Sequence, residues 1–434
     1  TGWYVAEETP RAWNFATDIV TENTTIYAGW TANTYNVTFD LQNGIGGDAT
    51  VLATYDSAMP QVVVPARAGY QFKGYYDAAD GGKQYYNADG SSAANWDKSE
   101  SETDSFVLYA QWTANTYTVT FDANGGRGTM EAQTMTYDTD VQFTKNTLTK
   151  EGYLFAGWAN EAGADSAAYA DEATVRNLTA NQGETLTLYA VWQPVLYRVA
   201  FDGNGADSGS MEAQQFTYDK KTVLPLNGYQ KTGYHFIGWA VTKDADKVAY
   251  TDRASVQNLT AENGVTVTLY AVWKPNTYQI AFYGNGGEGA MESQSFIYDE
   301  AGKALTKNLY RKTGYSFIGW ATTENADTAT YQDGQKVQNL ITQESGVLTL
   351  YAVWKANTYT LRFDSNQGEG SSIPTTAEPM MVTFGKVYGT LPDVFRAGYD
   401  FTGWYNQENI AILPDNVVDI TADTTLYAHW TAKK

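Results

Sequence analysis

The chain has 434 residues, with 49 acidic against 28 basic side chains and a formal net charge of −21. This balance argues against a polyanion such as DNA, RNA or heparin as a partner, because affinity for those rests on Lys and Arg. Hydrophobic residues make up 43% of the chain, which excludes a disordered chain. Cysteine is absent, so disulfides and thiolate chemistry are excluded as well. No apolar run reaches the 18 residues that suggest a membrane span, so we expect no membrane insertion in this segment.

The first motif in chain order is an apolar residue followed by Tyr-Ala-x-Trp. It occurs six times, beginning at Ile26, Leu108, Leu188, Leu269, Leu350 and Leu426. Its tyrosines are 76–82 residues apart, and similarity at a fixed period is the signature of a repeat architecture. The sequence therefore predicts a tandem array of repeats of about 80 residues.

A second motif, Tyr-x-apolar-x-Phe, follows each of the first five occurrences after four linking residues. It begins at Tyr35, Tyr117, Tyr197, Tyr278 and Tyr359. Large apolar and small polar residues alternate over 117–121, which predicts a strand with one buried face. Asn124-Gly125-Gly126 comes next and tolerates positive φ, so we expect a turn there.

A third motif, Gly-Tyr-x-Phe-x-Gly-Trp/Tyr, lies between the other two. It begins at Gly69, Gly152, Gly233, Gly314 and Gly398. It predicts a turn entering another strand, and the alternation in 185–192 predicts a closing strand with Leu186, Leu188, Ala190 and Trp192 on one face. Helical periodicity is weak, so we expect at most a short helix or 3₁₀ turn near 146–150.

These motifs divide the chain into five complete repeats and one partial repeat. The predicted domains are 1–30 (the back half of a truncated repeat), 31–113 (repeat 1), 114–193 (repeat 2), 194–274 (repeat 3), 275–355 (repeat 4) and 356–434 (repeat 5). Residues 1–4 match 402–405, which predicts that the segment belongs to a longer array with its export signal and anchor elsewhere. The four-residue linkers, two stiffened by Pro194 and Pro275, predict an elongated semi-rigid rod of about 150–200 Å.

The combination of 117–126, 152–158 and 188–192 resembles the Listeria–Bacteroides repeat, also called the internalin B-repeat. The resemblance covers all five complete repeats and the partial one. It implies a β-grasp-like (ubiquitin-like) domain, so the expected fold class is mainly β, α+β at most. The resemblance also implies that the repeats belong to a large secreted or wall-anchored bacterial protein. The family defines no catalytic residue. Repeat 1 departs from the pattern, with Tyr75 where other repeats have Trp.

Metal and catalytic sites receive little support. His235 and His429 occupy variable positions that we expect to be exposed, and no partner recurs at a fixed spacing. The loop Asp122-x-Asn124 offers two oxygen ligands where Ca²⁺ takes six or more, so turn capping is the better interpretation. We therefore predict no cofactor and no metal.

Aromatic side chains form the remaining candidate site. Of 13 tryptophans, eleven occupy the two repeated positions and are predicted to lie in cores or between domains. Trp13 and Trp96 lie outside the repeated positions. Trp96 is in a polar insert (85–104) that also holds Tyr85 and Tyr86. These four residues are the predicted ligand contacts, for a glycan or a protein.

The functional prediction is a non-catalytic, monomeric, extracellular spacer that projects another domain from a bacterial cell surface. The alternative is an adhesin array that binds a host or neighbouring-cell protein, or a glycan, through repeated weak contacts. The freely varying strand positions Thr118, Arg198, Gln279 and Thr360 favour the spacer. An enzyme ranks third and would need a single active site in the repeat 1 insert.

Overall fold

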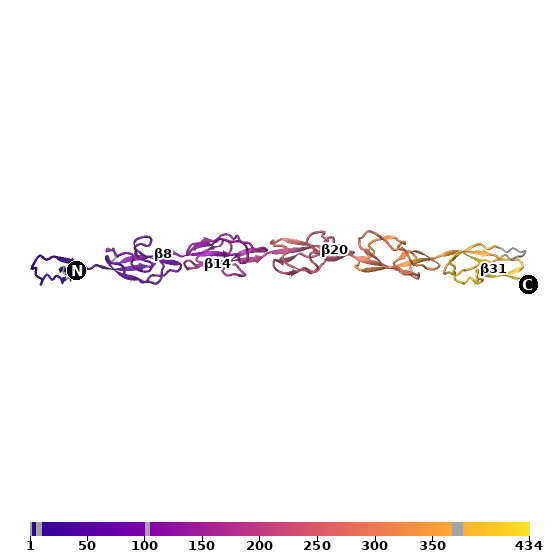
Figure 1. The fold of residues 1–434 in the computed structure, drawn as a ribbon, viewed down its shortest axis with the longest axis horizontal. Coiled ribbons are helices and arrows are strands. Elements are labelled where there is room, and N and C mark those ends of the chain that lie inside the picture. Colours follow the sequence, from indigo (N-terminus) through magenta and orange to yellow (C-terminus); the bar gives the residue numbers. More distant parts are fainter. Residues whose placement is uncertain (1, 6–10, 100–104, 367–375) are drawn as a thin grey trace. The chain divides into compact units, whose positions relative to one another are not determined.

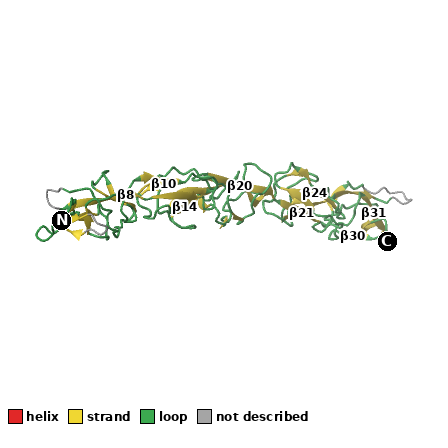
Figure 2. Ribbon diagram, turned by 60° about the vertical axis from the view of Figure 1, so that its left-hand side comes forward, coloured by secondary structure: helices red, strands yellow, loops and turns green. Residues whose placement is uncertain are grey.

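A computed structural model describes residues 2–5, 11–99, 105–366 and 376–434. The chain divides into two compact units: unit 1 is Thr1–Leu196 with Thr217–Asp219 and Thr260–Gly264, and unit 2 is Tyr197–Phe216, Lys220–Leu259 and Val265–Lys434. Strands and loops make up the described ranges of both (Figures 1 and 2). Within those ranges no helix is present that could cross a membrane.

Unit 1 holds the partial repeat and repeats 1 and 2. The partial repeat has β1 (Gly2–Val5), β2 (Arg11–Ala12) and β3 (Ile26–Gly29). Repeat 1 has β4 (Thr34–Asp40), β5 (Thr50–Thr54), β6 (Tyr70–Tyr76), β7 (Gln84–Tyr86) and β8 (Phe106–Ala114). Repeat 2 has β9 (Thr116–Asp122), β10 (Gln133–Thr136), β11 (Val141–Gln142), β12 (Tyr153–Ala159), β13 (Thr174–Val175) and β14 (Thr185–Pro194).

Unit 2 holds most of repeat 3 and all of repeats 4 and 5. Repeat 3 has β15 (Leu196–Asp202), β16 (Gln214–Thr217), β17 (Thr222–Val223), β18 (Tyr234–Ala240), β19 (Ser255–Val256) and β20 (Thr266–Pro275). Repeat 4 has β21 (Thr277–Tyr283), β22 (Gln294–Ile297), β23 (Lys303–Ala304), β24 (Tyr315–Ala321), β25 (Lys336–Val337) and β26 (Gly346–Ala356). Repeat 5 has β27 (Thr358–Asp364), β28 (Met380–Thr383), β29 (Tyr399–Tyr405), β30 (Ala411–Ile412) and β31 (Thr424–Ala432).

The complete repeats share one order of four strands, to which repeats 1 and 5 add a fifth strand, β7 and β30, beside the third-motif strand. In repeat 2 the order is β10-β9-β14-β12, and the first and last strands, β9 and β14, pair in parallel at the centre. The register places Phe121 opposite Leu188. The three predicted strands are thus confirmed, and the first and last motifs of the repeat lie side by side on the central pair.

Each complete repeat buries its own core. In repeat 2, Val119, Leu188 and Ala190 from the central strands pack with Trp158 from β12, and all four are nearly or fully buried. The alternation of large and small residues explains this, since side chains at positions i and i+2 share one face of a strand. Leu186 and Trp192 are partly buried against the same cluster, so the predicted face of 185–192 is confirmed.

The structure differs from the sequence prediction in the loops. Residues 146–150 contain no helical turn; Asn146 accepts from the Leu148 amide through its side chain at 2.9 Å and donates to the Leu148 carbonyl at 3.1 Å. Such a side-chain turn replaces the backbone bonds that a helix would make. The short pairs such as β11–β13 were also not predicted, because two-residue strands carry no periodic signal.

Candidate functional site

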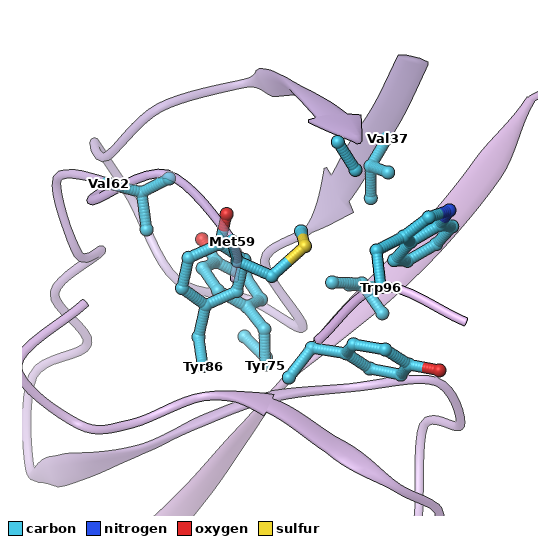
Figure 3. Close-up of a cluster of buried hydrophobic side chains, with 10 residues drawn as sticks. Val37, Met59, Val62, Tyr75, Tyr86 and Trp96 are labelled. Atoms are coloured by element: carbon cyan, nitrogen blue, oxygen red, sulfur yellow. The ribbon is translucent and has the colours of Figure 1, made fainter. Parts of the chain in front are cut away.

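Three of the four predicted ligand contacts lie in the core of repeat 1. Tyr85 and Tyr86 are fully buried in β7, and Trp96 is 1% exposed. Figure 3 shows Trp96 and Tyr86 pointing into an interior that they share with Met59 and Val37. These side chains leave no surface for a ligand to contact, so their placement argues for packing rather than binding.

The repeat 1 insert compensates for the tyrosine that replaces a tryptophan. Tyr75 is fully buried and stacks on Phe39 at 4.1 Å between ring centroids, and burial raises its pKa to about 12. The centroid of the Trp96 ring lies 5.0 Å from that of Phe106 and 5.1 Å from that of Tyr85. The insert thus returns aromatic volume to a core with a smaller third-strand residue. Positions 100–104 at its end lie outside the described residues.

Trp13 lies apart from that cluster, in the partial repeat. It is half-buried, its amide donates to the Trp3 carbonyl at 2.7 Å, and the Arg11 guanidinium lies 6.0 Å from its ring. The structure therefore does not bring Trp13 together with the other three candidates. Contact between Trp13 and a ligand stays a prediction.

The loop after the first strand is a capped turn. The Asn124 amide donates to the Asp122 carboxylate at 2.7 Å, and the Asn124 side chain donates to the Ala190 carbonyl at 2.8 Å. Asn124 has a φ of 47°, which asparagine tolerates better than most residues. The same side-chain bond recurs from Asn204, Asn285 and Asn366. The predicted turn capping is confirmed, and the asparagine also ties the loop to the closing strand.

The two histidines are partly exposed, and the His235 side chain is 37% exposed. His235 Nδ1 lies 2.7 Å from Asn276 Oδ1, and the His429 ring stacks on Tyr405 at 3.9 Å. The expectation of exposed positions is met in part, because His235 is hydrogen-bonded to Asn276 and the His429 ring is covered on one side by Tyr405. Over the described ranges, no three His, Asp or Glu side chains gather as a metal site would require.

The recurrent tryptophans hold the complete repeats together. The third-strand residues Trp158, Trp239, Trp320 and Trp404 are at most 2% exposed. The closing-strand tryptophans are half-buried and donate their indole N–H to a backbone carbonyl at the end of the first strand or in the loop after it, as Trp192 does to Ala123 at 2.8 Å. The core prediction is confirmed for the complete repeats. In the partial repeat, Trp3 and Trp30 are 46% and 89% exposed, so there it was wrong.

Consecutive repeats meet through a linker residue that bonds in both directions. The Asn276 amide donates to the Gly233 carbonyl of repeat 3 at 2.8 Å, and its carbonyl accepts from the Tyr298 amide of repeat 4 at 2.8 Å. Asn115 in unit 1 and Asn357 in unit 2 repeat this pattern between their own neighbours. A backbone bonded on both sides has little rotational freedom, so this junction is the best candidate for a functional site.

Side chains complete the junction. We call the first two residues of the third motif the Gly–Tyr corner, and the dipeptide that meets it from the next repeat the aromatic turn. The corners are Gly69-Tyr70, Gly152-Tyr153, Gly233-Tyr234 and Gly314-Tyr315, and the turns are Tyr137-Asp138, Tyr218-Asp219, Tyr298-Asp299 and Phe384-Gly385. Each glycine is covered by the aromatic ring of the turn, so that a Cβ there would lie 2.2–2.3 Å from the ring atoms.

The profile of the Listeria–Bacteroides repeat domain matches almost the whole chain. The matched residues are 1–29, 35–111, 117–191, 197–272, 278–353 and 359–429. The chain belongs to the Listeria–Bacteroides repeat family. Each of the six matches ends within one of the six occurrences of the Tyr-Ala-x-Trp motif.

Known proteins with similar sequences match this chain over less than half of their own length. A putative Gly-rich membrane protein of Evansella cellulosilytica is 31% identical over 84% of this chain, which spans 39% of that protein. Internalin H of Listeria monocytogenes is 38% identical over 26% of this chain and 19% of its own length. The Bacillus anthracis TIE protein, a solved structure, is 10% identical over 81% of each chain, with a TM-score of 0.26. That TM-score carries no inference about the fold.

In unit 1, the junction between Listeria–Bacteroides repeats 1 and 2 has a charged hydrogen bond. The Tyr70 hydroxyl donates to the Asp138 carboxylate at 2.8 Å, and the Asn177 side chain donates to it at 2.7 Å. These bonds, the one from Asn177 first, hold the pKa of Asp138 below its usual range. The Arg67 and Arg176 guanidinium groups lower it further.

Acid should weaken this junction. Because folding depresses the pKa of Asp138, its contribution is present above the unfolded value and lost as pH falls through the folded one, from about pH 4 downward. We expect Asp138→Asn to speed hydrogen exchange of the Tyr137 amide above about pH 4 and to match the wild type well below it. Variant and wild type would be compared at each pH; a difference that persists in acid would contradict this role.

The junction was not predicted from the sequence, although a sequence signal for it is present. A Tyr-Asp dipeptide recurs directly after the second strand, at Tyr55, Tyr137, Tyr218 and Tyr298. Its period matches that of the three motifs. Nothing in the sequence says, however, that the dipeptide of one repeat meets the glycine of the repeat before it.

Proposed function

We propose that this chain is a non-catalytic, semi-rigid spacer within a larger extracellular protein of a bacterial cell surface. The observation that carries the proposal is the junction in which one linker residue bonds the repeat before it and the repeat after it, as Asn276 does. A flexible tether would leave such backbone groups to water. The names of the relatives, a putative membrane protein and an internalin, support the surface location.

Each repeat is proposed to be a reduced β-grasp domain. The parallel pairing of the first and last strands at the centre of the sheet, β9 with β14 in repeat 2, fits that fold. The recurrent residues support a structural role, because the tryptophans fill cores, the asparagines cap turns and the glycines receive the next repeat.

Small-angle X-ray scattering of the full chain tests the spacer directly. We expect a maximum dimension of about 150–200 Å, from roughly 30–40 Å per domain, and a compact particle would contradict it. Screening the same protein against glycans and host proteins tests the alternative. Specific binding there would favour an adhesin, whereas an extended particle without binding would support the spacer.

A further inference from the structure

The corner and the turn fit each other in three ways at once. In unit 2, the Tyr298 ring covers Gly233 and meets the Tyr234 ring edge-on, with 6.1 Å between ring centroids. The Tyr234 hydroxyl donates to the Asp299 carboxylate at 2.9 Å. On the side of repeat 3, the Lys231 ammonium lies 4.4 Å from the centroid of the Tyr234 ring. This cation–π contact stabilises the Tyr234 ring where it meets Tyr298.

The turn is built to present its carboxylate. Asp299 has a φ of 58°, its amide donates to the Asn339 side chain at 2.7 Å, and its carboxylate accepts from that side chain at 2.6 Å. Asp138 has a φ of 59° and the equivalent bonds with Asn177. Aspartate is among the few L-residues that adopt the left-handed region, and the asparagine side chain adds two hydrogen bonds that fix it there. Both carboxylates are therefore positioned before the tyrosine hydroxyl binds them.

We propose that the Gly–Tyr corner is a docking surface that selects the aromatic–Asp turn of a neighbouring repeat, with the tyrosine-to-aspartate hydrogen bond as the lock. Glycine admits the ring, since any Cβ would occupy its place, and the hydroxyl recognises the carboxylate. The surface thus holds a repeat carrying Tyr-Asp more tightly than one that carries the ring alone. This inference deepens the proposed spacer function and rests on it for its biological meaning.

The junction between repeats 4 and 5 is a natural variant of the lock. There the turn is Phe384-Gly385, so the ring is kept and the carboxylate is absent. The Phe384 ring still covers Gly314 and meets Tyr315 edge-on at 5.6 Å. The Tyr315 hydroxyl would lie 3.1 Å from a Cβ on Gly385, so an aspartate at residue 385 would place its carboxylate beside that hydroxyl. This junction therefore has the ring contact without the tyrosine-to-aspartate hydrogen bond. We expect it to be more mobile than the junction between repeats 3 and 4.

Two substitutions with opposite expected effects test the lock in the full chain. Tyr234→Phe removes only the hydroxyl, and we expect a several-fold gain in the hydrogen-exchange rate of the Asn276 and Tyr298 amides. Gly385→Asp supplies the missing carboxylate at a residue with a φ of 73°, which aspartate tolerates at Asp138 and Asp299. It should slow exchange of the Phe384 amide, which donates to Asn357 across the junction at 2.9 Å.

Tyr229→Phe is the matched control, because its hydroxyl donates within repeat 3 to the Phe201 carbonyl at 2.7 Å and lies outside the junction. If Tyr229→Phe speeds exchange of the Asn276 and Tyr298 amides as much as Tyr234→Phe does, the effect is general loosening and the lock is refuted. Unchanged exchange in Tyr234→Phe refutes it as well.

A distance measurement separates this inference from the spacer function. The chain has no native cysteine, so spin labels on Lys243→Cys and Glu324→Cys, both exposed, report the spread of distances between repeats 3 and 4. A narrow distribution that broadens in Tyr234→Phe supports both proposals. A narrow distribution unchanged by Tyr234→Phe refutes only the lock. A broad distribution in the unsubstituted background contradicts the semi-rigid spacer.

Discussion

Replacing Trp239 by alanine should unfold repeat 3 while leaving repeat 5 folded. Trp239 is fully buried, with ring centroids 4.9 Å from those of Phe201 and Phe236. Removing a buried tryptophan costs about 3–5 kcal/mol, and a small domain often has little more than that in total. Since each complete repeat has its own core cluster, we expect the loss to stay largely local.

Hydrogen exchange measured by mass spectrometry on the full chain gives the required resolution by repeat. Peptides from β18 and β20 should lose protection, whereas those from β29 and β31 should keep it. Trp30→Ala is the control, because that residue occupies a recurrent tryptophan position but is 89% exposed. Equal loss of protection in both variants would contradict the assignment of Trp239 to the core.

Replacing Gly157 by alanine should destabilise repeat 2 by several kcal/mol. Gly157 lies at the irregularity in the β12–β14 pairing and has a φ of 134°, which L-residues rarely adopt. A Cβ there would lie 2.3 Å from the Tyr169 carbonyl oxygen, which accepts from the Trp158 amide. Backbone strain of about 1–3 kcal/mol adds to an overpacking cost of about 1–3 kcal/mol.

Gly403 in repeat 5 separates the two costs. It has nearly the same φ, 133°, but the nearest atom to a Cβ there is 3.7 Å away, on the Tyr405 ring. We therefore expect Gly403→Ala to show the backbone strain alone, and hydrogen exchange in β12 and β29 would measure both. Equal destabilisation would mean that the Tyr169 segment moves aside at no cost, contrary to the packing described.

The junction and the repeat 1 insert show how far sequence reasoning extends. Trp96 was predicted as a ligand contact because it stands alone in a polar insert with no counterpart in other repeats. Its burial became evident only when the fold placed it beside Phe106, since solvent exposure depends on contacts distant in sequence. Tyr298 and Gly233 are likewise 65 residues apart, and no local pattern records their contact.

The repeat period, the three principal strands of each repeat and the turn after the first strand can all be predicted from the amino-acid sequence. These follow from local rules: alternation along a strand, and the residues that tolerate positive φ. The parallel strand pairing, the burial of particular aromatic rings and the contacts between neighbouring repeats are visible only in the folded chain. Those features depend on shape and contact between distant segments, and a residue such as Gly233 carries its role only because Tyr298 covers it.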